Sequence, residues 1–160
     1  MKIWKHALLA CLAAALLWAA LPAASAAGAE PVLRVTEGGA PRGGTAEVAL
    51  WLDGGAAVSG GSMDLTYDSA ALELLELRPA ELGGTLVQVN PHYTEDSARL
   101  SFASGQALGE DSVLLCTALF RVREDAPLGE SAVGLENARL YDESAAPCGV
   151  RVESGAVEAQ

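Results

Sequence analysis

The chain has 160 residues and is acidic, with 10 Lys and Arg against 21 Asp and Glu. Both lysines lie within the first five residues, so the rest of the chain carries eight arginines and 21 acidic residues, a net charge of 8 − 21 = −13. This charge excludes nucleic acid as a partner, because phosphate binding needs basic patches, and it excludes an anionic membrane surface for the same reason. It fits a soluble protein whose partner is neutral or basic.

Residues 1–26 have the pattern of a secretory signal peptide. Lys2 and Lys5 precede an uncharged run over residues 7–21, and Pro22 and a small-residue site ending at Ala26 follow it. We expect cleavage after Ala26 and a secreted protein that has no membrane association after cleavage. An uncleaved anchor is the alternative, because the uncharged stretch is long enough to cross a bilayer.

Beyond residue 30, short alternating apolar segments separated by turn residues predict nine β-strands. Glycine-rich residues 38–44 are predicted to form a loop. This pattern predicts an all-β sandwich or barrel, formed by one domain over residues 30–158. The predicted strands, in chain order, are 32–37, 45–52, 60–67, 72–77, 86–89, 99–103, 113–123, 131–140 and 149–158.

The stretch 69–77 is ambiguous, because its Ala, Leu and Glu residues are strong helix formers. We nevertheless predict a strand from Leu72, because Pro79 restricts the preceding residue to extended conformations and the surrounding segments are strands. Asp68 is expected to cap a single turn before this strand. The alternation slips at Leu74-Leu75, which predicts a β-bulge.

Few residues suggest chemistry. Cys116 and Cys148 are the two cysteines beyond the signal peptide, and the sequence leaves open whether they form a disulfide. His92 is the one histidine there, and no nucleophile motif accompanies it. Acidic pairs such as Glu110-Asp111 lie in predicted loops, where solvated turns explain them. We therefore predict no enzyme activity, no cofactor and no metal site.

Several segments, in the right order, resemble the cohesin module family. The resemblance rests on Met63-Asp-Leu-Thr-Tyr-Asp68 with Leu72-Glu-Leu74, on the strand entry 43–50, on Arg99-Leu-Ser-Phe102, on residues 115–123 and on Gly155-Ala-Val157. It implies a nine-stranded jelly-roll β-sandwich, a fold similar to that of carbohydrate-binding modules. It also implies that the chain binds a dockerin module.

The resemblance further implies a docking face on the third, fifth, sixth and eighth strands. We assign these strands to 60–67, 85–90, 98–104 and 113–123, and alternation then selects the outward side chains. The apolar residues among them suggest a docking patch with a charged rim. The predicted partner-binding residues are Ser62, Asp64, Thr66, Arg99, Ser101, Val113, Leu115, Thr117, Leu119 and Arg121.

The expected function is therefore that of a secreted binding module for a dockerin on a polysaccharide-degrading enzyme, in a cellulosome-type assembly. One alternative is a carbohydrate-binding module of similar fold with a polysaccharide as partner. Trp51, predicted to point outward, is the aromatic residue that would favour it, although a single exposed Trp is more often local packing. Another is a structural cell-envelope sandwich without a dockerin partner.

Overall fold

The computed structural model describes residues 29–160, so the predicted signal peptide lies outside the described part. All the regular structure in this part is β. The strands are β1 (Val32–Val35), β2 (Gly38–Ala40), β3 (Thr45–Asp53), β4 (Gly60–Tyr67), β5 (Leu72–Pro79), β6 (Thr85–Asn90), β7 (Ser97–Ser104), β8 (Val113–Val122), β9 (Gly129–Tyr141), β10 (Pro147–Cys148), β11 (Arg151–Glu153) and β12 (Gly155–Ala159).

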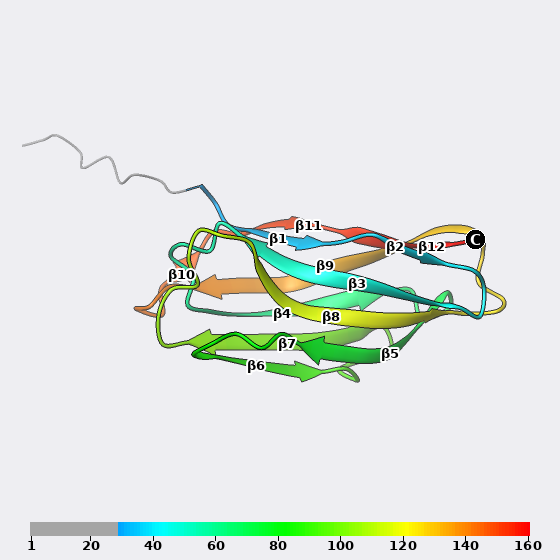
Figure 1. Cartoon of the computed structure of the whole chain (residues 1–160), viewed down its shortest axis with the longest axis horizontal. Coiled ribbons are helices and arrows are strands. Elements are labelled where there is room, and N and C mark those ends of the chain that lie inside the picture. Colours follow the sequence, from blue (N-terminus) through cyan, green and yellow to red (C-terminus); the bar gives the residue numbers. More distant parts are fainter. Residues whose placement is uncertain (1–28) are drawn as a thin grey trace, which may run out of the picture.

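The strands form two sheets that pack face to face as a sandwich (Figure 1). One sheet has the order β11-β1-β3-β8-β5, and the other has the order β2-β12-β9-β4-β7-β6, with β10 paired to β9. The predicted all-β sandwich is confirmed. The structure contains more strands than predicted because the last predicted strand is split into β11 and β12, and because β2 and the short β10 are additional. Residues 38–40, predicted as loop, form β2 instead.

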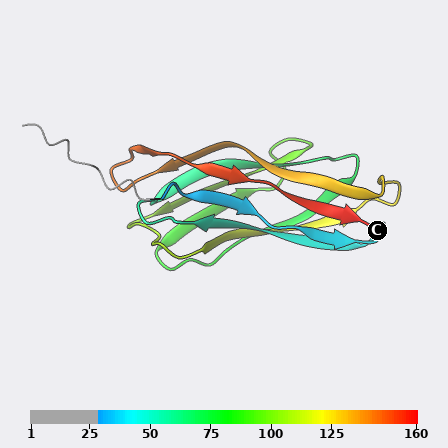
Figure 2. The ribbon, with the colours of Figure 1, turned by 90° about the horizontal axis from the view of Figure 1, so that it is seen from above.

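The first and last strands of the chain run side by side, and both cross from one sheet to the other. β1 pairs in parallel with β11 in the five-stranded sheet, and β2 pairs in parallel with β12 in the other sheet. Figure 2 shows the blue first strands and the red last strands running next to each other in the same direction. At the crossing, an added Cβ on Gly155 would lie 2.2 Å from the backbone oxygen of Thr36, so only glycine fits there.

The ambiguous stretch is a turn followed by a strand, as predicted. The Asp68 side chain accepts a hydrogen bond from the backbone N–H of Ala70 at 2.9 Å, and β5 begins at Leu72. The pairing of β5 with β8 shifts register between Leu74 and Glu76, which confirms the bulge. Pairing with β8 therefore overrides the helix propensity of this segment.

The core lies between the two sheets, and inward side chains of every long strand contribute to it. Tyr67 from one sheet meets Phe120 from the other edge to face, with ring centroids 5.0 Å apart. Such an aromatic pair stabilises the sandwich by about 0.5–1.5 kcal/mol beyond its buried area. Cys116 and Cys148 are free thiols, one buried on β8 and one on β10 of the other sheet. Residues 29–160 contain no helix long and apolar enough to cross a membrane.

Candidate docking face

The outer face of β9-β4-β7-β6 is a layered surface, because strand register aligns residues of like character across it. One row is apolar and uncharged, the next is polar and carries a charge only at Arg139, and the third is charged except at Asn90. The three rows are Leu86, Ala103, Gly60 and Tyr141, then Gln88, Ser101, Ser62 and Arg139, then Asn90, Arg99, Asp64 and Glu136.

The two central strands of this face carry a strip of small side chains, made of Gly60, Ser62, Ser101 and Ala103. We call these four residues the small-residue strip. Larger side chains from β6 and β9 stand on either side of it, among them Leu86, which is 62% exposed. Because β6 and β9 are three strand spacings apart, the flanking side chains are separated by about 14 Å. That width accommodates a single secondary-structure element of a partner.

Next to the small-residue strip, Asp64 is held by three hydrogen bonds. Arg99 donates from Nε to Oδ1 at 2.7 Å and from Nη2 to Oδ2 at 2.9 Å, and Asn137 donates from Nδ2 to Oδ2 at 2.8 Å. Asn137 reaches this position because β9 bulges there and its φ is 51°, a conformation that Asn tolerates well. The Arg99 guanidinium also lies over the ring of Tyr93, with Cζ 3.9 Å from the ring centroid.

The electrostatics of this cluster fix its charge state. The hydrogen bonds from Arg99 lower the pKa of Asp64 and outweigh the opposing effect of burial, and the bond from Asn137 lowers it further. The same pairing raises the pKa of Arg99. Asp64 is only 4% exposed, so a partner meets mainly the guanidinium. A guanidinium carries five N–H donors, and those not bonded to Asp64 remain for an acceptor on a partner.

The structure brings together five of the predicted partner-binding residues on this face. Ser62, Asp64 and Thr66 lie on β4, and Arg99 and Ser101 lie opposite them on β7. Their outward orientation follows the predicted alternation, since Met63, Leu65, Leu100 and Phe102 are buried.

The other five predicted residues lie elsewhere, so their assignment to this face is wrong. Val113, Leu115, Thr117, Leu119 and Arg121 belong to β8. That strand pairs with β3 and β5 in the opposite sheet. When β1 and β2 are counted as one strand, β8 is the seventh strand and β9 is the eighth, which is the strand that completes the face.

Two of these five residues also have the wrong orientation. The register of β3 with β8 shifts so that Leu115 is an extra residue between Leu114 and Cys116, and Leu115 is fully buried. Before this bulge the alternation is reversed, so Val113 lies opposite the buried Leu52 and packs against the core. Beyond the bulge, Thr117, Leu119 and Arg121 do point outward.

The prediction included the strand 85–90, which is β6, but it named none of the residues of this strand, and it left out β9. Leu86, Gln88 and Asn90 were detectable, because they alternate with Val87 and Val89, which pack against the core. Arg139 and Tyr141 required the correct strand count. The bulge at Asn137 has no clear signal in the sequence.

The outer face of the five-stranded sheet differs in character, because ion pairs cover it. Five of the six ion pairs among residues 29–160 lie in this sheet. Trp51 points outward there between Arg34 and Leu114, and it is half-buried. A solvated sheet face normally has this polar character. The ion pairs are Arg34–Asp53, Arg78–Glu47, Arg78–Glu76, Arg121–Glu73 and Arg151–Glu153.

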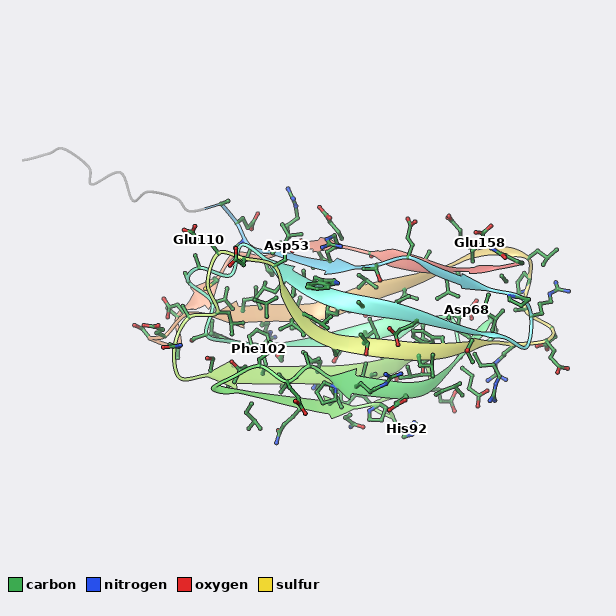
Figure 3. All side chains as sticks on the ribbon, viewed as in Figure 1. Asp53, Asp68, His92, Phe102, Glu110 and Glu158 are labelled. Carbon is green, nitrogen blue, oxygen red and sulfur yellow. The ribbon has the colours of Figure 1, made fainter. Side chains whose placement is uncertain are left out.

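The titratable loop residues are dispersed. Figure 3 shows His92 at the lower margin of the sandwich, whereas Glu110 and Asp68 lie toward opposite ends of it. No group of three or more His, Cys, Asp or Glu residues in the described part of the chain is placed to hold a metal ion.

The fold matches those of solved cohesin domains. The sixth cohesin of scaffoldin B from Acetivibrio cellulolyticus, solved with a Cel5 dockerin, aligns with a TM-score of 0.72 at 16% identity over 82% of this chain and 99% of that one. A non-cellulosomal cohesin from the archaeon Archaeoglobus fulgidus gives 0.71 at 16% identity, over 82% and 92%. A type I cohesin–dockerin complex from Clostridium thermocellum gives 0.69 at 18% identity, over 82% and 94%.

No protein-family model matches the chain, and no curated protein matches it. At 11–18% identity, the likeness to the cohesin structures is a likeness of fold. The cohesin-like β-sandwich is therefore confirmed.

Proposed function

We propose that the chain is a secreted, non-enzymatic binding module that docks a dockerin on a polysaccharide-degrading enzyme through the outer face of β9-β4-β7-β6. The observation that carries this proposal is the contrast between the two sheets. One outer face has an uncharged small-residue strip beside the anchored Arg99, and the other is covered by ion pairs. An interface centre depleted in charge with a polar rim is typical of protein docking surfaces.

The fold supports a dockerin as the partner. Two of the solved structures described above contain a dockerin bound to the cohesin. The described chain shares their sandwich, and its face presents both an apolar end at Leu86 and Tyr141 and hydrogen-bonding groups at Ser62, Ser101 and Arg99. The signal peptide predicted at residues 1–26 supports export, which would place the module where polysaccharides are degraded.

Glycan binding has weaker support. Carbohydrate platforms generally present several aromatic rings on one face. Here Trp51 and Tyr141 lie in opposite sheets, so they cannot contact the same glycan chain in that way. One side of the Tyr93 ring is covered by the guanidinium of Arg99.

The test uses the dockerins encoded in the source genome as a panel, together with soluble and insoluble glycans. The variants Ser62→Arg and Ser101→Arg place a bulky charge in the small-residue strip. We expect each to weaken dockerin binding at least about 30-fold, equivalent to ~2 kcal/mol at an interface centre. Thr117→Arg is the matched control, because Thr117 is also half-buried and outward but lies in the opposite sheet.

Two outcomes would reject a dockerin partner, and a third would reject the proposed face. Binding to glycans alone, lost on Trp51→Ala, would assign the chain to carbohydrate recognition. Binding of no dockerin in the panel would favour a structural role in the cell envelope. If Thr117→Arg weakened dockerin binding as strongly as Ser62→Arg, a dockerin partner would stand but the proposed face would be wrong.

A further inference from the structure

Apart from the two-residue β10, the two sheets of the sandwich end in four edge strands, and three of these carry features that discourage pairing with another chain. β2 and β11 are each three residues long, and β11 also carries Arg151 and Glu153. β5 contains Glu73, Glu76 and Arg78, bulges at Leu75 and ends at Pro79. Short length, charge, bulges and proline are the devices by which natural sheets block edge-to-edge association.

The fourth edge strand, β6, has none of these devices. It is six residues long, Thr-Leu-Val-Gln-Val-Asn, without charge or proline, and its pairing with β7 is regular throughout. Figure 1 shows it at the lower margin of the sandwich with no strand beyond it. Its inward residues Val87 and Val89 are only partly buried. A shallow hollow of about 530 Å³ lies beside them, lined in part by Pro79.

Charge distribution indicates which molecule can pair with this edge. Residues 82–94 contain no Asp, Glu, Lys or Arg, and they form the longest such stretch beyond residue 30. Two copies of a chain with a net charge of −13 repel each other, and the repulsion is weakest where the contacting segments are uncharged. β6 also offers no charge that would select a charged peptide.

We propose that β6 pairs with β6 of a second copy, in antiparallel orientation, and joins two sandwiches into one continuous sheet. A twofold axis perpendicular to the sheet keeps inward residues opposite inward residues when it passes through Val87 or Gln88. Val87 and Val89 of both copies then cover one another at the sheet junction, and the two outer faces lie on the same side. This proposal does not depend on the identity of the partner docked on the outer face.

The test is the molar mass of the protein, measured by sedimentation equilibrium from about 10 µM to about 1 mM, a range suited to a small and weak interface. A reducing agent prevents disulfide formation through Cys148, which is partly exposed. The wild-type mass is expected to rise with concentration toward twice the monomer mass. A mass that stays monomeric throughout would overturn the proposal.

Charge variants test the strand itself. Leu86 and Gln88 are exposed and point outward, so the double variant Leu86→Glu/Gln88→Glu keeps the monomer fold. With the axis at Val87, position 86 of each copy lies opposite position 88 of the other, and with the axis at Gln88 the two positions 88 lie opposite each other. Either register therefore brings carboxylates together, and we expect the dissociation constant to rise at least about tenfold. The double variant Leu86→Lys/Gln88→Lys should likewise be monomeric, and an equimolar mixture of the two should form a mixed dimer. Dimers that persist in the Glu variant, or the absence of a mixed dimer, would contradict pairing through β6.

Discussion

Arg99 and Asp64 face each other directly across β7 and β4 and form a bidentate ion pair, with N–O distances of 2.7 and 2.9 Å. The carboxylate is almost fully buried, whereas the Arg99 side chain is 39% exposed. Such a pair orients the guanidinium beside the small-residue strip and restricts its rotamers. We infer that Asp64 acts mainly as a positioning residue, and that Arg99 is the group presented to a partner.

Removal of the carboxylate tests this relationship. Asp64→Ala leaves the guanidinium of Arg99 and the amide of Asn137 without their shared acceptor. We expect a loss of about 1–3 kcal/mol in the free energy of unfolding, because a buried hydrogen-bonded partner is lost. Urea unfolding measures it. Glu153→Ala is the control, since the exposed pair of Glu153 with Arg151 should contribute no more than about 0.5 kcal/mol. Equal losses in the two variants would contradict a special role for Asp64.

Stability should depend on pH in the acid range. The folded-state pKa of Asp64 is lowered from 3.8 by its hydrogen bonds with Arg99, and that of Asp53 is lowered by its hydrogen bonds with Ser112 and Arg34. A lowered folded pKa means that the stabilisation is fully present above the unfolded pKa and is lost as pH falls through the folded pKa. We therefore expect the free energy of unfolding to decline from about pH 4 downward.

The contribution of Asp64 is isolated by comparison with Asp64→Asn, which cannot ionise. Urea unfolding of both proteins at several pH values should show a difference in stability that is constant near neutrality and shrinks below about pH 4. A difference that grows on acidification would have the wrong sign for a lowered pKa.

The sequence predicts which way a strand's side chains point better than it predicts which sheet the strand joins. Ser62, Asp64 and Thr66 were placed outward from alternation alone, because side chains on a strand alternate between its two faces. Which sheet a strand joins depends on pairings between distant segments, such as Ala46 with Phe120. Nothing in the local pattern of β8 encodes that pairing, and for this reason half of the predicted site was assigned to the wrong face.

Bulges limited the prediction in a second way. The slip at Leu74-Leu75 was visible because two large apolar residues are adjacent. The bulges at Leu115 and Asn137 were not, because the apolar run around Leu115 reads equally well in either phase and the sequence around Asn137 has no strong alternation. The Asn137 bulge brings the third hydrogen bond to Asp64, so this part of the site required the structure.

The two cysteines should differ in reactivity. Burial raises the pKa of the Cys116 thiol to about 12, whereas Cys148 is partly exposed and its pKa is raised by burial and by Asp142. Because the thiolate is the reactive form and access is needed, a thiol reagent should label Cys148 first and Cys116 only after unfolding. Mass spectrometry of peptides from native and urea-unfolded protein measures this order. Rapid native labelling of Cys116 would contradict its burial in the sheet.

Leu119 provides a test of the corrected sheet assignment. It lies half-buried on β8 between Glu47 on β3 and Glu76 on β5. Both glutamates pair with Arg78, so the group around Leu119 keeps one net negative charge. Leu119→Asp would add a second negative charge there and remove apolar contact, so we expect a stability loss of about 1–2 kcal/mol. Leu119→Lys should be less destabilising, because its ammonium faces two carboxylates. Thermal unfolding separates the two variants, and partner binding should be unaffected in both. Weaker partner binding at 25 °C by the folded Leu119→Lys protein would show that β8 belongs to the docking surface.

The crossing of the terminal strands should be the least tolerant position of the backbone. In Gly155→Ala, the new Cβ would lie 2.2 Å from the Thr36 oxygen and 2.8 Å from that of Val35, so β1 and β12 must separate. We expect a destabilisation of about 1–3 kcal/mol or more, since backbone atoms cannot yield as a flexible side chain can. Gly83→Ala is the matched control, because a Cβ there meets nothing within 4 Å. Hydrogen exchange should show faster opening of β1, β2 and β12 in Gly155→Ala, while β4 and β7 stay protected. Wild-type stability in Gly155→Ala would mean that the terminal strands do not cross at this contact.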